Sequence, residues 1–320
     1  MDKHLVSPNP HIHSAVSTAS LMRDVIIALV PAIVVSVLFY GWAELLVLAV
    51  SAVACVLFKW AIAKFLFKKP ELCCPSAALV TGLLLAMNLP VSTPWWIVVI
   101  GALFAIGVVK MSFGGIGQNV FNPAIAARVF LLVSFPQQMT DWTASAGFIG
   151  NVDAFSGATL LGQVHILGPL EADKLVSLQT LFYNIGGSAG EISALALLAG
   201  WVYLLVRRVI KPWITLSIFA TVALIAAIFH LVDPTLYTGP LFNLLTGGLI
   251  LGACFMATDY VTSPMSTWGG VIYGVGIGFL VMMIRYFGSY PEGVSFAILL
   301  MNMTVPLLNR WFHGKKYGRA

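Results

Sequence analysis

The sequence predicts an all-α polytopic membrane protein with about ten transmembrane helices, some short or broken, in two inverted five-helix repeats. Its mean hydropathy is +0.95, and of its 320 residues 59% are hydrophobic and only 9% are charged. A soluble domain usually carries about 25% charged residues, so little polar surface is left to face water. Apolar runs near the length of about 20 residues that crosses a bilayer recur along the chain. The net charge of +5 therefore reports on membrane orientation, and we expect lipid rather than nucleic acid as a partner.

Ten apolar segments, separated by polar connections, give the predicted helices in order. They cover residues 22–40, 44–66, 76–90, 95–111, 120–135, 188–206, 212–231, 241–257, 269–287 and 293–309. The third and fifth segments are short, with Pro75 and Pro90 flanking the third and Pro123 and Pro136 flanking the fifth. Short segments interrupted by proline are typical of helices that are broken or cross only part of the bilayer.

The basic residues predict how these helices are oriented. Ten spans place the basic connections on one side, which the positive-inside rule identifies as the cytoplasm, together with both termini. These residues are Lys3, Arg23, Lys59, Lys64, Lys68, Lys69, Lys110, Arg207, Arg208, Lys211, Arg310, Lys315, Lys316 and Arg319. The opposite side receives the mainly acidic segment 136–187. Arg285, near the outer end of the ninth segment, departs from this pattern.

A faint internal repeat relates the two halves of the chain. LVTGLLLAMNLPVSTP, residues 79–94, aligns with LILGACFMATDYVTSP, residues 249–264, at an offset of 170 residues. Each half then contains five spans, and an odd number inverts the second half relative to the first. The predicted division is a cytoplasmic arm (1–21), a first five-helix repeat (22–135), an extracytoplasmic segment (136–187), a second, inverted repeat (188–309) and a cytoplasmic tail (310–320).

The extracytoplasmic segment contains the stretch DAFSGAT, which ends at Thr159. Gly157 permits a tight turn, Ser156 and Thr159 supply hydroxyls, and Ala158 keeps the approach to Thr159 open. Asp153 could bind backbone amides or a metal ion. A threonine hydroxyl needs activation to act as a nucleophile, and no histidine or lysine lies within the stretch. The pattern therefore favours a modification acceptor over a catalytic centre, with a simple loop turn as the alternative.

Polar residues within the apolar segments are functional candidates, because polar groups are costly inside a bilayer. Arg128 lies in the middle of the fifth segment, where an acidic partner or the carbonyls of a broken helix could satisfy it. Asn122 stands at the start of that short helix. A cluster follows the eighth segment and could bind a ligand or simply cap the next helix. The cluster consists of Thr258, Asp259, Thr262 and Ser263.

Small and sulfur-containing residues have structural roles in this interpretation. Gly270, Gly274 and Gly278 have the spacing that lets membrane helices pack closely, within the chain or with a partner. Cys73 and Cys74 are adjacent and lack other ligands nearby, so we expect a structural role, with a redox or metal role as the alternative. We expect no metal site.

Three stretches of the sequence resemble signature stretches of a known protein family. D-x-x-S-G-A-T is similar to the flavinylation motif of the RnfD and NqrB family. GGIGQNVFNPAIAARVFLLVSFP, residues 114–136, and FMATDYVTSP, residues 255–264, look like that family's other signature stretches. The resemblance covers most of the chain, and the short N-terminal arm looks more like the RnfD side of the family. Asp259 is followed here by Tyr260, where many relatives have proline.

The resemblance implies FMN joined by a phosphoester to Thr159, attached by a dedicated flavin transferase, and a second, noncovalent riboflavin. Thr258, Asp259 and Ser263 would bind the riboflavin, and Arg128 could pair with a flavin phosphate. The family's complexes link ferredoxin and NAD⁺ and move Na⁺ or H⁺ across the bacterial inner membrane. The chain has no NAD motif and no cysteine cluster, so iron–sulfur subunits and a second flavinylated subunit are expected partners, and no complete active site lies on this chain.

Two other functions remain compatible with the topology. Ten spans, inverted halves and broken helices also fit a secondary transporter or channel without flavin, because fold alone does not set function. A purely structural assembly subunit is the third possibility. Bound flavin would distinguish a flavin-carrying redox subunit from a transporter or channel. A Thr159→Ala variant that assembles but loses electron transfer would distinguish the flavin-carrying redox subunit from a purely structural subunit.

Overall fold

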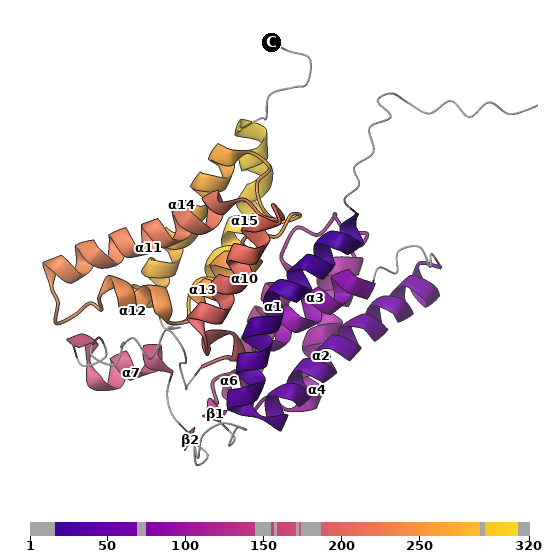
Figure 1. Cartoon of the computed structure of the whole chain (residues 1–320), viewed down its shortest axis with the longest axis horizontal. Coiled ribbons are helices and arrows are strands. Elements are labelled where there is room, and N and C mark those ends of the chain that lie inside the picture. The colour runs from indigo at the N-terminus through magenta and orange to yellow at the C-terminus, as the bar shows by residue number, and fades with distance from the viewer. Residues whose placement is uncertain are drawn as a thin grey trace, which may run out of the picture.

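The computed structural model describes residues 17–68, 75–144, 155–156, 159–170, 173, 187–288 and 292–312. It confirms an all-α membrane protein, with helices in each of the ten expected places (Figure 1). Besides helices, the described residues form one short antiparallel β ladder, two residues long on each strand. It pairs β1 (Thr143–Ala144) with β2 (Phe155–Ser156).

The first half contains five helical spans. They are α1 (Thr18–Tyr40), α2 (Trp42–Ala61) continued by η1 (Ile62–Leu66), α3 (Pro75–Ala86), α4 (Trp95–Leu103) continued by η3 (Phe104–Met111), and α5 (Pro123–Ser134), with α6 (Pro136–Met139) after them. Gly41, at φ 69°, separates the first two helices. Proline at the first position begins α3 and α5, where its missing N–H and fixed φ cost nothing.

The second half follows α7 (Leu160–Leu167) and the short turn η4 (Ala189–Glu191). Its helices are α10 (Ala194–Val206), α11 (Pro212–Val232), α12 (Pro240–Leu245), α13 (Leu249–Leu251) continued by η5 (Gly252–Met256), α14 (Thr267–Phe287) and α15 (Val294–Trp311). The eighth expected span is broken, which its continuous apolar pattern does not predict. Gly247 and Gly248 adopt positive φ values of 70° and 64° between α12 and α13, a conformation that glycine adopts without strain.

The order and packing of helices repeat between the halves. α2 packs against α3 and α4 in the first half, as α11 packs against α12 and α14 in the second. The equivalent first helices, α1 and α10, pack against each other and run antiparallel. The Tyr40 hydroxyl donates to the Gly187 carbonyl (2.9 Å) beside the end of α1 and the start of α10. At the other end, Arg207 pairs with Asp24 (3.4 Å). This antiparallel pairing is the inversion that an odd number of spans requires.

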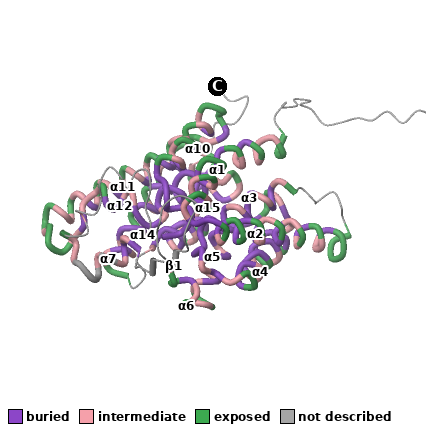
Figure 2. Tube along the Cα trace, turned by 60° about the horizontal axis from the view of Figure 1, so that its bottom comes forward, coloured by how far each residue is buried: buried purple, intermediate pink, exposed green. Residues whose placement is uncertain are grey.

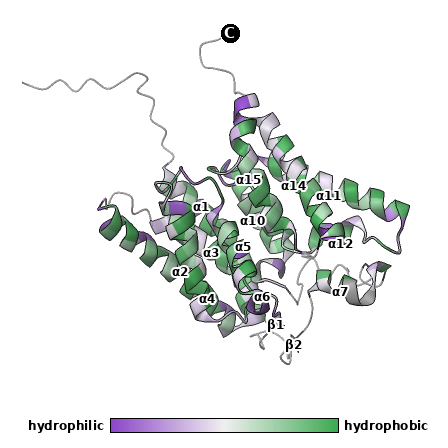
Figure 3. Cartoon of the chain, turned by 180° about the vertical axis from the view of Figure 1, so that it is seen from behind, coloured by the Kyte–Doolittle hydropathy of each residue, from purple (hydrophilic) through white to green (hydrophobic). Residues whose placement is uncertain are grey.

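The outer surface of the bundle is apolar. Among the described residues, four helical runs are long and apolar enough to cross a membrane: Thr18–Tyr40, Trp42–Leu66, Pro212–Val232 and Thr267–Phe287. Shorter apolar helices stand beside them, including Pro75–Ala86 and Pro123–Ser134, as expected for the third and fifth segments. Exposed residues on these helices (Figure 2) are largely hydrophobic (Figure 3), for example Leu46, Leu224 and Phe279. An exposed apolar surface of this extent fits contact with lipid.

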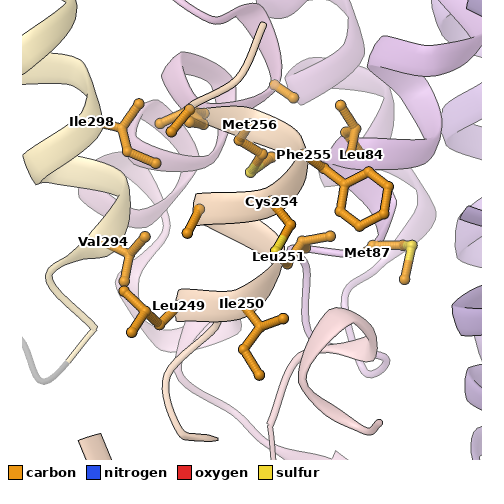
Figure 4. Packing of buried hydrophobic residues seen from close by; sticks show 14 of the residues in the cluster. Leu84, Met87, Leu249, Ile250, Leu251, Cys254, Phe255, Met256, Val294 and Ile298 are labelled. Atoms are coloured by element: carbon orange, nitrogen blue, oxygen red, sulfur yellow. The ribbon is translucent and has the colours of Figure 1, made fainter. Parts of the chain in front are cut away.

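The core lies where the two halves meet. η5 stands between α15 and the first half, and its side chains fill the space between them (Figure 4). Phe255 and Met256 lie toward Leu84 and Met87, while Val294 and Ile298 of α15 line the other side. This dry packing fixes η5 in place and, with it, the polar residues that follow at 257–263.

The glycines of α14 let it approach α11 closely, so their predicted packing role is confirmed within the chain. A Cβ at Gly274 would lie 2.7 Å from the Ile214 carbonyl oxygen. A Cβ at Gly276, on the same helix, would meet only the flexible end of Met301.

We therefore expect Gly274→Ala to lower the thermal midpoint of the purified chain, because overpacking against backbone costs about 1–3 kcal/mol. Gly276→Ala is the matched control, and helix propensity favours it by up to about 1 kcal/mol. Thermal unfolding in detergent measures both. Equal midpoints for the two variants would contradict the close contact of α11 and α14.

Candidate functional site

Thr159 begins α7 as its N-cap residue. Its Oγ1 accepts a hydrogen bond from the Gly162 amide (3.1 Å), and its φ and ψ of −55° and 159° are extended. The residue is 5% exposed, so the approach to its hydroxyl is less open than the sequence suggests. Ser156 pairs with Thr143 in the β ladder. The remaining motif residues, Asp153, Gly157 and Ala158, lie outside the described residues.

A cavity of about 310 Å³ lies beside α7. Leu161 and Val164 of α7 form one wall, and Asn243, Arg285 and Tyr286 form part of the other; we call this space the α7 cavity. Its volume lies at the lower end of the roughly 300–1,000 Å³ typical of small-molecule sites. The first amides of α7 have no acceptor within the helix itself, and helix N-termini favour a phosphate attached near the cap residue. The residues present thus fit a phosphate-linked group on Thr159.

Arg128 has the acidic partner that was one of the sequence-based alternatives. Its guanidinium forms a buried ion pair with Glu292 and donates to Asn88 Oδ1 (3.1 Å) and Ser295 Oγ (3.2 Å). These partners come from α15, the loop just before it and the end of α3, so the pair joins the two halves. The Arg128 guanidinium is engaged by these partners. Arg128 therefore lines neither the α7 cavity nor the second cavity, which lies between the halves.

Asn122 also joins the halves. Its Oδ1 caps α5 by accepting from the amides of Ala124 (3.1 Å) and Ile125 (3.4 Å). Its amide nitrogen donates to the Met256 carbonyl at the end of η5 (3.1 Å). A short helix thereby starts inside the protein with its first amides satisfied.

A second cavity, of about 80 Å³, lies between the halves. Among its lining residues are Thr81, Lys110, Asn122, Thr258 and Asp259, together with apolar side chains of α1, α3 and α10; we call it the inter-repeat cavity. Lys110 Nζ donates to the Ala77 carbonyl (2.9 Å) and to Thr81 Oγ1 (3.1 Å). Donors and acceptors from several segments therefore converge on one apolar space, the usual composition of a ligand site.

The cluster after the eighth span does not cap the next helix. That role belongs to Ser266, whose Oγ accepts from the Gly269 amide (3.1 Å). Thr258 Oγ1 donates to the Cys254 carbonyl (2.8 Å), and Thr262 Oγ1 donates to Asp259 Oδ2 (3.2 Å). Thr258 and Asp259 line the inter-repeat cavity, whereas Ser263 lines neither cavity.

Glu292 and Lys110 are site residues that the sequence did not indicate. In the sequence, Glu292 stands just before the tenth apolar segment, and Lys110 belongs with the basic residues of the cytoplasmic side. The structure buries Lys110 to 7% exposure. The sequence feature that could have indicated burial of Lys110 is its position at the end of an apolar run with no neighbouring charge.

Two of the four cysteines lie in the part of the chain that the structure describes. Cys55 and Cys254 are buried, while Cys73 and Cys74 lie outside the described residues. Within the described ranges no group of histidine, cysteine and acidic residues could hold a metal ion.

The chain is similar to proteins of one family along nearly its whole length. The model of the NQR2, RnfD, RnfE family matches residues 5–318. The D subunit of the Na⁺-translocating ferredoxin:NAD⁺ oxidoreductase complex of Acetobacterium woodii is 43% identical over 98% of this chain and 95% of its own length. The D subunits of the ion-translocating oxidoreductase complexes of Stutzerimonas stutzeri and Halorhodospira halophila are 40% and 38% identical, over 95% and 97% of this chain and 93% and 94% of their own. The expected likeness to the RnfD side is confirmed: the chain is a member of the NQR2, RnfD, RnfE family.

Proposed function

We propose that the chain is the flavin-carrying membrane subunit of an ion-translocating oxidoreductase complex. The names of its relatives, which describe D subunits of such complexes, support this assignment. The observation that carries it is the position of Thr159, the last residue of the flavinylation-like motif, at the start of a helix and beside the α7 cavity. The chain would relay electrons between ferredoxin- and NAD-linked partner subunits, and the complex would couple that transfer to movement of Na⁺ or H⁺.

Thr159 would hold FMN through a phosphoester on Oγ1. FMN, when bound, supplies the ability to accept and donate electrons. The residues of this chain hold and orient it. The first amides of α7 favour the phosphate, and the low exposure of Thr159 keeps the link against the protein. Ser156, Gly157, Ala158 and Asp153 form the motif that a flavin transferase would recognise.

A noncovalent riboflavin would bind at the inter-repeat cavity. Asn122, Thr258 and Asp259 offer donors and acceptors that suit the polar edge of a flavin ring, and the apolar side chains suit its faces. The volume of about 80 Å³ is below the roughly 300 Å³ of ordinary ligand sites. The side chains that line the cavity must therefore move aside to admit the whole ring.

Exposed basic residues support the proposed orientation. Arg23, Lys64, Arg207, Lys211 and Arg310 are exposed, each at the helix end that the sequence places in the cytoplasm. Among the described residues, Arg285, near the other end of α14, and Arg128, in the middle of α5, are buried. We infer that both termini lie in the bacterial cytoplasm and that Thr159 lies on the extracytoplasmic side of the inner membrane.

In-gel fluorescence of the denatured chain tests the flavin assignment. The chain is produced in a host with an active flavin transferase, denatured in SDS and viewed under ultraviolet light. A fluorescent band identifies a covalent flavin that survives denaturation. A dark band, with the transferase active on another acceptor, would favour a secondary transporter or channel without flavin.

We expect Asp259→Asn to weaken riboflavin retention about tenfold or more, because a hydrogen bond to a charged group contributes about 1.5–3 kcal/mol. Thr258→Val should weaken it several-fold, because a neutral hydrogen bond contributes about 0.5–1.5 kcal/mol. Acid extraction and chromatography of the purified chain measure riboflavin, with the covalent FMN as internal standard. Ser263→Ala is the control, since Ser263 lines neither cavity. Unchanged retention in the first two variants would place the riboflavin elsewhere.

A further inference from the structure

Arg285 is a buried cation in the last turn of α14, on the same side of the protein as α7. The residue is 7% exposed. Its Nη1 donates to the Asn243 carbonyl (2.6 Å) and its Nη2 to the Thr246 carbonyl (2.8 Å). Its Nε has no acceptor in the described part of the chain. These partners are neutral, and burying a charge without a counter-ion is costly.

No carboxylate of the described residues forms an ion pair with Arg285. Glu191 and Glu292 act on its charge from a distance, and Glu292 is already paired with Arg128. The Gly247–Gly248 turn separates Glu191 from the guanidinium. A Cβ at Gly248 would lie 3.4 Å from Glu191 Oε1, whereas a Cβ at Gly247 would lie 2.7 Å from Arg285 Nη2. An anion brought to the Gly247 side would therefore approach the Nη2 edge of a cation that has no ion-pair partner among the described residues.

The α7 cavity lies on that side. Arg285 lines it together with Asn243, Thr238 and Tyr286, and Leu161 and Val164 close it from α7. Its volume of about 310 Å³ reaches the range of roughly 300–1,000 Å³ in which proteins bind small molecules. The space thus combines a buried positive charge, an aromatic ring and apolar walls.

Thr159 does not line this space, but it lies next to a residue range that does. A Cβ at Gly247 would meet Leu161 Cδ1 as well as Arg285 Nη2, so the leucine side chain and the guanidinium come together over this glycine. Leu161 is in the first turn of α7, two residues after Thr159. A group attached to the threonine hydroxyl would therefore start within one helical turn of the cavity wall.

We propose that Arg285 is the counter-ion of the phosphodiester on Thr159 and that the α7 cavity holds the tethered flavin. This inference rests on the proposed attachment of FMN to Thr159. A phosphodiester keeps one negative charge, and arginine is well suited to bind it because its planar fork donates to phosphate oxygens. Arg285 is a positioning residue that fixes the phosphate and adds positive charge next to the flavin. This role also explains why an arginine stands on the side that the positive-inside rule leaves without basic residues.

The test compares Arg285→Gln with Arg285→Lys in the full-length chain, produced with the flavin transferase and purified in detergent. Peptide mass spectrometry first establishes how much Thr159 carries FMN in each variant. Redox titration, with the Thr159→Ala spectrum subtracted, then gives the midpoint potential of the covalent flavin. Iodide quenching of its fluorescence reports its exposure. Arg207→Gln, which removes an exposed arginine at the opposite ends of the helices, is the matched control.

We expect Arg285→Gln to lower the midpoint potential, because a nearby positive charge favours the reduced, more negative flavin. Iodide quenching should rise several-fold as the phosphate loses its partner. Arg285→Lys should retain most of the wild-type potential, and Arg207→Gln should change neither quantity. Unchanged potential and quenching in Arg285→Gln, with Thr159 fully loaded, would overturn the proposal and leave Arg285 to another anion such as a lipid headgroup.

Failure of the proposed function and misfolding of the Arg285→Gln variant can each be distinguished from failure of this proposal. If wild-type Thr159 carries no FMN while the transferase is active, the proposed function itself fails. If Arg285→Gln does not fold, Leu161→Trp decides, because it fills the α7 cavity and keeps the positive charge of Arg285 in the protein. A loaded Leu161→Trp chain with increased iodide quenching would support the cavity as the flavin site, and one with wild-type quenching and potential would contradict it.

Discussion

Thr159→Ala is expected to remove the covalent flavin and reduce ferredoxin:NAD⁺ electron transfer by the complex to the level of membranes that lack it. Alanine offers no hydroxyl for a phosphoester, and the motif contains no other threonine. The fold should tolerate the change, because loss of an N-cap hydrogen bond at Gly162 costs only about 1 kcal/mol. The measurements are fluorescence of the chain, co-purification of the partner subunits and electron transfer in membrane vesicles.

The matched control is Thr140→Ala. Thr140 is an exposed threonine earlier in the same segment, 136–187, and its hydroxyl donates to backbone carbonyls. It should retain fluorescence and full activity. Electron transfer that persists at the wild-type rate in an assembled Thr159→Ala complex would assign the chain a structural role. Loss of assembly in both variants would show that the segment serves packing instead.

The second large effect is expected at the ion pair that joins the two halves. Arg128→Met leaves Glu292, whose side chain is 13% exposed, without its charged partner, and it leaves the Asn88 and Ser295 oxygens without this donor. Breaking a buried pair by removing one partner typically costs about 3–5 kcal/mol. We expect a large fall in the thermal midpoint of the purified chain and loss of the monodisperse peak on size-exclusion chromatography.

Two companion variants test the cause. Arg128→Met combined with Glu292→Met removes both charges and should recover most of the lost stability, because the cost lies in the unpaired charge. Arg207→Met removes an arginine whose side chain is 52% exposed, and exposed pairs contribute at most about 1 kcal/mol. Equal losses for Arg128→Met and Arg207→Met, or no recovery in the double variant, would contradict a buried ionic link between the halves.

The ten helical segments were predictable because each is an apolar run bounded by proline, glycine or basic residues. Pro75, Pro123 and Pro212 begin helices where the sequence expects them. The break in the eighth span was not predicted. Its apolar pattern continues through Gly247 and Gly248, and only their positive φ values reveal the turn. Hydrophobic periodicity indicates which residues are buried. It does not show that the chain changes direction at Gly247 and Gly248.

The partners of the polar residues were not predictable for a different reason. Arg128 and Glu292 lie 164 residues apart, and no local pattern indicates that they meet. The same holds for Lys110, which the charge pattern places in the cytoplasm but which lies buried beside Thr81. Arg285 was visible as an exception to the charge pattern, yet its place in the α7 cavity depends on how α14 packs. Local motifs make Thr159 a candidate, and tertiary packing decides what surrounds it.

Peptide mass spectrometry of residues 153–159 tests the central claim most directly. The chain is co-produced with an active flavin transferase and digested after denaturation. We expect this peptide to be heavier by FMN less one water, with the added mass on Thr159, and Thr159→Ala to yield the unmodified mass. An unmodified Thr159, recovered while the transferase modifies another acceptor in the same cells, would contradict the assignment of this chain as a covalent flavoprotein.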